Sequence, residues 1–243
     1  MAAAAAVQAS RITWSQSQRV IATRFPSKHL FEGVAAQDDW DNLERLANLT
    51  SPRVQQSESG WGMFKATDCA TGEGASLIMA PFAYRHADGS RFTDGTYGAY
   101  YAGRDLKTAI DETVYHAEKF ARDSRLPPIT FEKQVLEARI AGAFHDLRKS
   151  LPDKKILSKD SYAVSQPFAR KLREHDHSNG IVYPSVRSAG GECVAVFLPR
   201  LVTDCRRTRY LAYVWDGTAI TQVYEMSAVQ ALKPKAGKLP KKR

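Results

Sequence analysis

Apolar residues recur at helical spacing in three segments of the chain. The clearest segment runs from residue 105 to about residue 121, with Asp105 suited as its N-cap. The segments 38–50 (DDWDNLERLANLT) and 165–175 (SQPFARKLREH) predict two shorter helices, and Ser165 is the expected cap of the second. The apolar stripe of the 105–121 helix consists of Leu106, Ala109, Ile110, Thr113, Ala117 and Phe120.

One carboxylate of this helix, Glu112, lies beside the stripe rather than in it. At about 100° per residue it is roughly 120° from the centre of the stripe. Such a position suits the lip of a cleft and also suits a solvated surface residue. Helix geometry alone favours the surface.

Strand-like runs follow in the second half of the chain. Residues 134–140 (QVLEARI) predict a strand, and residues 143–149 (AFHDLRK) predict a short helix after it. The pair Asp216–Gly217 predicts a hairpin turn between the last two of three closing strands. Early helices followed by late strands favour a single α+β domain. The three closing strands are expected at 191–198, 209–215 and 219–225.

Composition places the chain among ordinary folded proteins. With 243 residues and 43% hydrophobic content it can bury a sizeable core, and it has no run of about 18 apolar residues that would span a membrane. Residues 1–17 begin MAAAAAVQASR and lack the basic segment of a signal peptide, so they are expected to be a flexible N-terminus. The three cysteines form no CxxC pair, which favours a reduced, cytoplasmic protein.

The net charge of +9 is concentrated at the C-terminal end. Residues 233–243 hold six basic residues and no acid, which leaves a net charge of +3 on the rest of the chain. Residues 229–243 are therefore expected to be a disordered, solvated basic tail, and weak attachment to nucleic acid through it is the alternative.

Four short segments carry candidate chemistry. Arginine binds pyrophosphate through its planar, permanently charged fork, and a tyrosine ring can stack on a flat heterocycle. A carboxylate can stabilise the positive charge that develops at an anomeric carbon as a glycosidic bond breaks. The candidates are Arg24 in TRFP, Arg91 in a glycine-flanked turn, Tyr100 and Tyr101 on the strand after it, Glu112, and Ser185 in YPSVR.

Two other kinds of site fit these residues less well. Ser185 as a hydrolase nucleophile would need a GxSxG elbow, and YPSVR is not one. His175 and His177 could bind a metal, but no second pair of ligands follows at a suitable spacing, so a polar loop is expected and no metal.

Two segments of the chain resemble the RES domain family, which is named for arginine, glutamate and serine. The first is SRF-x-DG-x-YG-x-YYA-x-R-x-L-x-TAI-x-E and the second is SNGIVYPSVR-x-x-GGECVAVF-x-P, and the resemblance extends over residues 18–228. It implies an ADP-ribosyltransferase-like fold with central mixed sheets flanked by short helices. It also implies a toxin-like enzyme that cleaves the nicotinamide–ribose bond of NAD by hydrolysis or phosphorolysis, with an Xre-type helix-turn-helix antitoxin as partner. A protein ADP-ribosyltransferase and a non-catalytic NAD-binding module are the alternatives.

The resemblance also assigns roles. Arg24 and Arg91 would hold the NAD phosphates and ribose, and Glu112 would stabilise the oxocarbenium-like transition state. Tyr101, with Tyr100 as the competing choice, would stack on or orient the nicotinamide, and Ser185 would hydrogen-bond the nicotinamide side of the ligand.

This sequence departs from the family in two respects. Phe25 stands where many members have a tyrosine, so it can stack but cannot donate a hydrogen bond. The long span between Arg24 and Arg91 predicts an insertion within about 38–85. No GxGxxG or P-loop occurs, which is consistent with NAD as substrate and with no bound cofactor.

Overall fold

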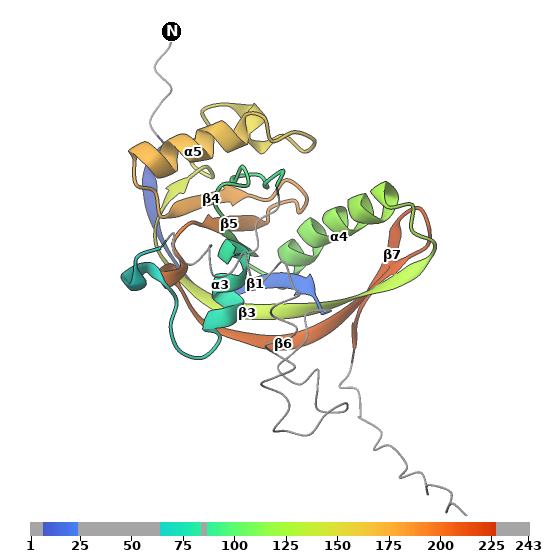
Figure 1. The fold of residues 1–243 in the computed structure, drawn as a ribbon. Coiled ribbons are helices and arrows are strands. Elements are labelled where there is room, and N and C mark those ends of the chain that lie inside the picture. The colour runs from blue at the N-terminus through green and yellow to red at the C-terminus, as the bar shows by residue number, and fades with distance from the viewer. Residues whose placement is uncertain (1–6, 24–63, 84–86, 227–243) are drawn as a thin grey trace, which may run out of the picture.

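The computed structural model of the protein describes residues 7–23, 64–83 and 87–226 (Figure 1). Within these ranges the seven strands are β1 (Ala9–Ala22), β2 (Tyr100–Gly103), β3 (Ile129–Asp146), β4 (Gly180–Pro184), β5 (Glu192–Val196), β6 (Val202–Trp215) and β7 (Ile220–Met226). The helices are α3 (Ala75–Ala83), α4 (Leu106–Asp123) and α5 (Ser165–His175), with short 3-10 turns η2 (Ala66–Asp68), η3 (Lys154–Leu157) and η4 (Pro199–Leu201).

The strands form one mixed sheet in the order β1-β2-β5-β4-β3-β6-β7. Strand β1 pairs with both β2 and β3, so the first five strands of this order close on themselves, while β6 and β7 extend the sheet beyond β3. Among the described strands, only β3 and β4 pair in parallel. The predicted α+β class is confirmed, with one sheet in place of the several expected.

Helix α4 begins and ends close to the predicted positions. The Asp105 carboxylate caps it by accepting a 2.8 Å hydrogen bond from the backbone N–H of Thr108. The helix buries small side chains, Ala109 and Ala117, against a cluster on β1, β3 and β6. Phe120, expected in the buried stripe, is 59% exposed. The buried face of the helix is narrower than the predicted stripe and is formed by small residues such as these two alanines.

Three further expectations are corrected. Residues 9–17 are not a flexible end, because β1 pairs with β3 from Ala9 opposite His145 to Ala22 opposite Lys133. The same pairing keeps residues 143–146 in β3, so the short helix expected at 143–149 is wrong. The N-cap of α5 is Val164, and Ser165 instead lies inside the first turn, where its hydroxyl donates to the Tyr162 carbonyl.

Other predictions are confirmed or lie outside the described residues. Helix α5 spans 165–175 as predicted, and β6 and β7 form the hairpin closed at Asp216 and Gly217. The helix expected at 38–50 and the basic tail lie outside the described ranges.

The sheet has packed layers on both faces near β2. One layer contains Tyr100 with Phe82 of α3, and the other contains Phe92 and the α5 residues Ala169 and Leu172. Tyr101 packs partly against the second layer. Consecutive residues of β2 therefore point to opposite sides of the sheet, as strand geometry requires.

Candidate active site

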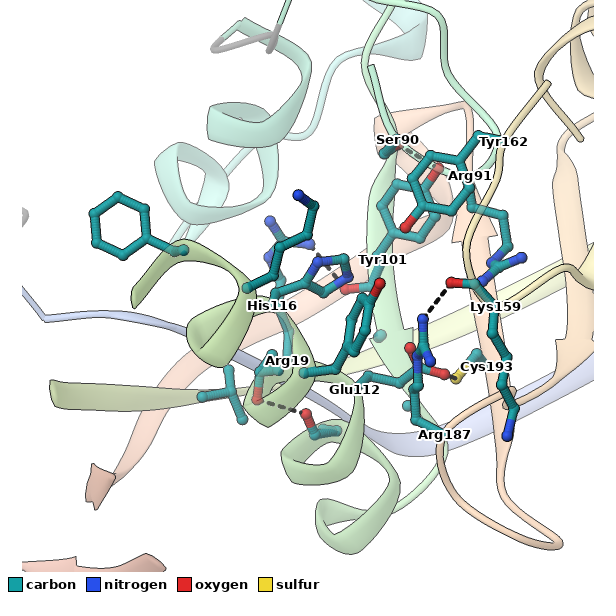
Figure 2. Close-up of a pocket in the computed structure, with 18 of the residues that line it drawn as sticks. Arg19, Ser90, Arg91, Tyr101, Glu112, His116, Lys159, Tyr162, Arg187 and Cys193 are labelled. Carbon is teal, nitrogen blue, oxygen red and sulfur yellow. Dashed lines mark hydrogen bonds between the residues drawn. The ribbon is translucent and has the colours of Figure 1, made fainter. Parts of the chain in front are cut away.

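A cavity of about 840 Å³ lies between α4, β1, β2 and the loops around residues 88–91, 159–162 and 187 (Figure 2). Its volume falls within the range of small-molecule sites. Its lining has both signs of charge, with four acidic side chains and five basic ones: Arg19, Arg91, Lys119, Lys159 and Arg187. Such a lining suits a ligand with phosphate groups at one end, which the basic side chains bind, and a hydroxyl-bearing or positively charged group at the other, which a carboxylate binds.

Glu112 enters this cavity from α4 and is held by a residue of another element. Its Oε1 accepts a 2.6 Å hydrogen bond from the hydroxyl of Ser185, which follows β4. The same hydroxyl accepts the backbone N–H groups of Arg187 at 3.1 Å and Ser188 at 2.8 Å. A hydroxyl has one donor and two acceptor positions, so all of them are used. Ser185 therefore fixes the Glu112 carboxylate instead of presenting a free donor to a ligand.

Cys193 of β5 is the second group beside Glu112. Its Sγ donates to Glu112 Oε1 at 3.8 Å. Burial, and after it the neighbouring Glu112 carboxylate, raises the pKa of the Cys193 thiol well above its ordinary value. The thiol therefore stays protonated, acting as a weak donor to the carboxylate and not as a nucleophile.

Arg91 lies in the wall of the cavity and is 6% exposed. Its Nη1 donates to the carbonyls of Ser158 at 2.8 Å and Ile156 at 3.4 Å, and its Cζ lies 5.1 Å from the centre of the Tyr162 ring. Among the described residues, its Nε and Nη2 have no hydrogen-bond acceptor. These donors remain available to an anion in the cavity.

The two adjacent tyrosines of β2 have different environments. Tyr101 lines the cavity, and its hydroxyl accepts hydrogen bonds from Ser90 Oγ at 2.7 Å and the Phe92 N–H at 2.9 Å. Burial is the main reason that the pKa of Tyr101 rises to about 12, so it is neutral. Tyr100 is fully buried on the other side of the strand, where its hydroxyl lies 3.9 Å from Cys205 Sγ. Tyr100 as a ligand-binding residue is therefore wrong.

Known protein families provide a separate comparison for this chain. A family model described as RES domain matches residues 67–216, which is more than half of the chain. The chain belongs to the RES domain family. RES domains are associated in general with NAD-related toxin function. The chain is also similar to the uncharacterized protein y4oC of Sinorhizobium fredii (strain NBRC 101917 / NGR234), with 27% identity over 206 residues and coverage of 85% of each chain.

The RES match begins within the range in which an insertion is expected. Residues 67–83 fall inside the match, and the insertion within about 38–85 stays a prediction. Helix α3 lies in this stretch and buries Ile78 and Phe82 in the core beneath β2. Strand β1 precedes the match in sequence but belongs to the same sheet.

Several residues of this RES domain cavity are not predicted by the sequence reasoning. Arg19 of β1 donates through Nη1 to the Tyr101 carbonyl at 2.9 Å, with its Cζ 5.0 Å from the Tyr100 ring centre. Arg187 donates to the Lys159 carbonyl, and its Cζ lies 3.3 Å from the Tyr115 ring centre. Arg187 could have been found from the sequence, because it lies two residues from the candidate Ser185.

The remaining predicted residues lie elsewhere. Arg24 and Phe25 are outside the described residues. His175 and His177 lie at the end of α5, and no group of three or more potential ligands in the described part of the chain could hold a metal. No helix within the described ranges is long and apolar enough to cross a membrane.

Proposed function

We propose that this RES domain cleaves the nicotinamide–ribose bond of NAD, with water or inorganic phosphate as acceptor. The observation that carries the proposal is the Glu112 carboxylate, held by Ser185 at the wall of a cavity that also presents Arg91 and Tyr101. The family's association with NAD points to the same substrate.

The chemistry requires a fixed negative charge near the reacting carbon. When neutral nicotinamide leaves, positive charge develops on the ribose anomeric carbon and ring oxygen. A carboxylate oriented before the reaction stabilises that charge without having to reorganise. The hydrogen bond from Ser185 provides this orientation, because it joins α4 to the loop after β4.

The arginines suit the pyrophosphate of NAD. Arg91 keeps donors for an anion after binding two backbone carbonyls, and Arg19 and Arg187 are anchored in the same way, each by one carbonyl. Anchored arginines lose little side-chain entropy when they bind phosphate oxygens. We assign these three residues to the phosphate and ribose end of the ligand.

Tyr101 suits the nicotinamide ring. Its hydroxyl is held by Ser90 and Phe92, so the ring orientation is set before a ligand enters. It belongs to β2, which lies beneath the first turn of α4 that leads to Glu112. We assign its ring to contact with the nicotinamide.

The test is incubation of the purified protein with NAD, with and without inorganic phosphate, followed by identification of every product. The proposal expects free nicotinamide together with ADP-ribose or phosphorylated ADP-ribose. Transfer of ADP-ribose to a protein would indicate the transferase alternative. Thermal stabilisation by NAD without turnover would indicate a binding module.

A further inference from the structure

A histidine lies on the same face of α4 as Glu112 and has no role in the proposed function so far. His116 follows Glu112 by one helical turn, at the i,i+4 spacing that brings side chains about 5–6 Å apart at Cβ. Both residues line the cavity, and Figure 2 shows both side chains directed into it. His116 as a whole residue is exposed, so the cavity walls cover it only in part.

The surroundings of His116 favour the neutral form of its imidazole. Burial by the cavity walls is the main reason that its pKa is lowered, and the positive charges of Arg187, Arg91 and Lys119 act in the same direction. Glu112 acts in the opposite direction. Among the described residues the ring packs edge-on against Tyr115, at 5.3 Å between ring centres, and no hydrogen bond occupies its nitrogens. One ring nitrogen is therefore free to accept a proton.

Glu112 has a different task in the proposed reaction. Its Oε1 already accepts from Ser185 and Cys193, and its charge is needed opposite the developing cation. Asp123 also lines the cavity, but it is paired with Lys119 at 2.6 Å. His116 is thus the neutral base nearest to Glu112 along the helix.

We propose that His116 is the general base that takes the proton from the acceptor water. The inference rests on the proposed function. In the step, the glycosidic C–N bond breaks and its electron pair leaves with neutral nicotinamide. The water oxygen bonds to the anomeric carbon, and the water proton passes to the imidazole and then to solvent.

The acceptor decides whether this base is needed. Water must lose a proton as it attacks, whereas the hydrogen phosphate dianion attacks through an oxygen that is already negative. His116 should therefore matter for hydrolysis and should be dispensable for phosphorolysis, while Glu112 should matter for both.

The experiment compares wild type, His116→Gln and the matched control His175→Gln, which changes an exposed histidine of α5. Nicotinamide release from NAD is measured from pH 5 to pH 9, without phosphate and at saturating phosphate, and the melting temperature verifies folding.

The rate of hydrolysis by His116→Gln should be about 100-fold lower than that of the wild type. The wild-type hydrolysis rate should fall as the pH drops below the pKa of His116, because the protonated ring cannot act as a base, and the variant should lack this decline. Any phosphorolysis by the wild type should persist in the variant.

Three results would overturn the inference: unchanged hydrolysis in a folded variant, an unchanged pH profile, or equal loss with water and with phosphate. If His116→Gln does not fold, His116→Ala with added imidazole replaces it, and failure of imidazole to restore hydrolysis would also overturn the inference. A wild-type protein that releases no nicotinamide under any condition would instead contradict the proposed function.

Discussion

The Ser185 hydroxyl donates a 2.6 Å hydrogen bond to Glu112, a residue 73 positions away in the sequence. It joins the loop after β4 to α4 across the cavity wall. Because the same oxygen accepts two backbone N–H groups of its own loop, the geometry of that loop sets the position of the carboxylate. Ser185 is therefore a positioning residue for Glu112.

Replacing Ser185 by alanine should lower kcat for nicotinamide release by about 10- to 100-fold and leave the KM for NAD nearly unchanged. A hydrogen bond to a charged group contributes about 1.5–3 kcal/mol, and each 1.36 kcal/mol in the barrier is tenfold in rate. Steady-state kinetics of nicotinamide release measure this. Ser185→Thr keeps the hydroxyl and should restore most of the rate, while Ser124→Ala, at the exposed end of α4, should have no effect. A change confined to KM would show that Ser185 acts on the ligand and not on Glu112.

The adjacent tyrosines of β2 offer a matched pair of substitutions. Tyr101→Phe removes the acceptor of the buried Phe92 N–H, so the free energy of unfolding should fall by about 1–3 kcal/mol. The KM for NAD should rise, because Phe92 follows Arg91 directly. Tyr100→Phe removes only a long contact to Cys205 and should cost less than about 1 kcal/mol, with unchanged KM. Denaturant unfolding and steady-state kinetics test both variants, and equal effects on KM would contradict the assignment of Tyr101 to the site.

Lowering the pH should reduce the free energy of unfolding, because Asp146 becomes protonated. The Arg148 side chain is the main cause of the lowered pKa of this carboxyl, which is 1% exposed and accepts bonds from Arg148 Nε at 2.9 Å and Nη2 at 2.8 Å. Because the folded-state pKa lies below the unfolded value of about 3.9, the stabilisation is complete above that value and is lost as the pH falls through the folded pKa.

Asp146→Asn should therefore cost about 1.5–3 kcal/mol at pH 7 and show a smaller loss of unfolding free energy between pH 5 and pH 3 than the wild type. Denaturant titrations at each pH measure this. Asp123→Asn, which removes an exposed i,i+4 ion pair, is the control and should cost about 0.5 kcal/mol or less. Parallel pH curves for wild type and Asp146→Asn would contradict the assignment.

The parts of the fold predicted from sequence are those with strong local periodicity. Helices α4 and α5 and the β6–β7 hairpin show regular apolar spacing, caps or turn residues. Strand β1 lacks this pattern because serine and glutamine residues interrupt its apolar positions. Its stability comes from pairing with β3, which lies far along the chain. The end of β3 has a local sequence that resembles a helix. Its strand conformation depends on pairing with β4, which lies more than thirty residues later and cannot be read from the local sequence.

The site was predicted less completely for a similar reason. Glu112, Arg91 and Tyr101 were selected by resemblance, and the cavity brings them together. Tyr100 and Tyr101 could not be separated, since alternation says only that they face opposite sides. Arg19 belongs to a strand whose position was not predicted, and the value of His116 depends on its neighbours in space.

The central claim is that the Glu112 charge is needed for cleavage of NAD, and Glu112→Gln tests it most directly. Glutamine keeps an oxygen for the Ser185 hydroxyl, so the melting temperature should stay close to that of the wild type. Nicotinamide release should fall by about 100-fold or more, with water and with phosphate alike. Glu174→Gln, on the exposed face of α5, should leave the rate unchanged. A folded Glu112→Gln protein that releases nicotinamide at the wild-type rate would contradict the account.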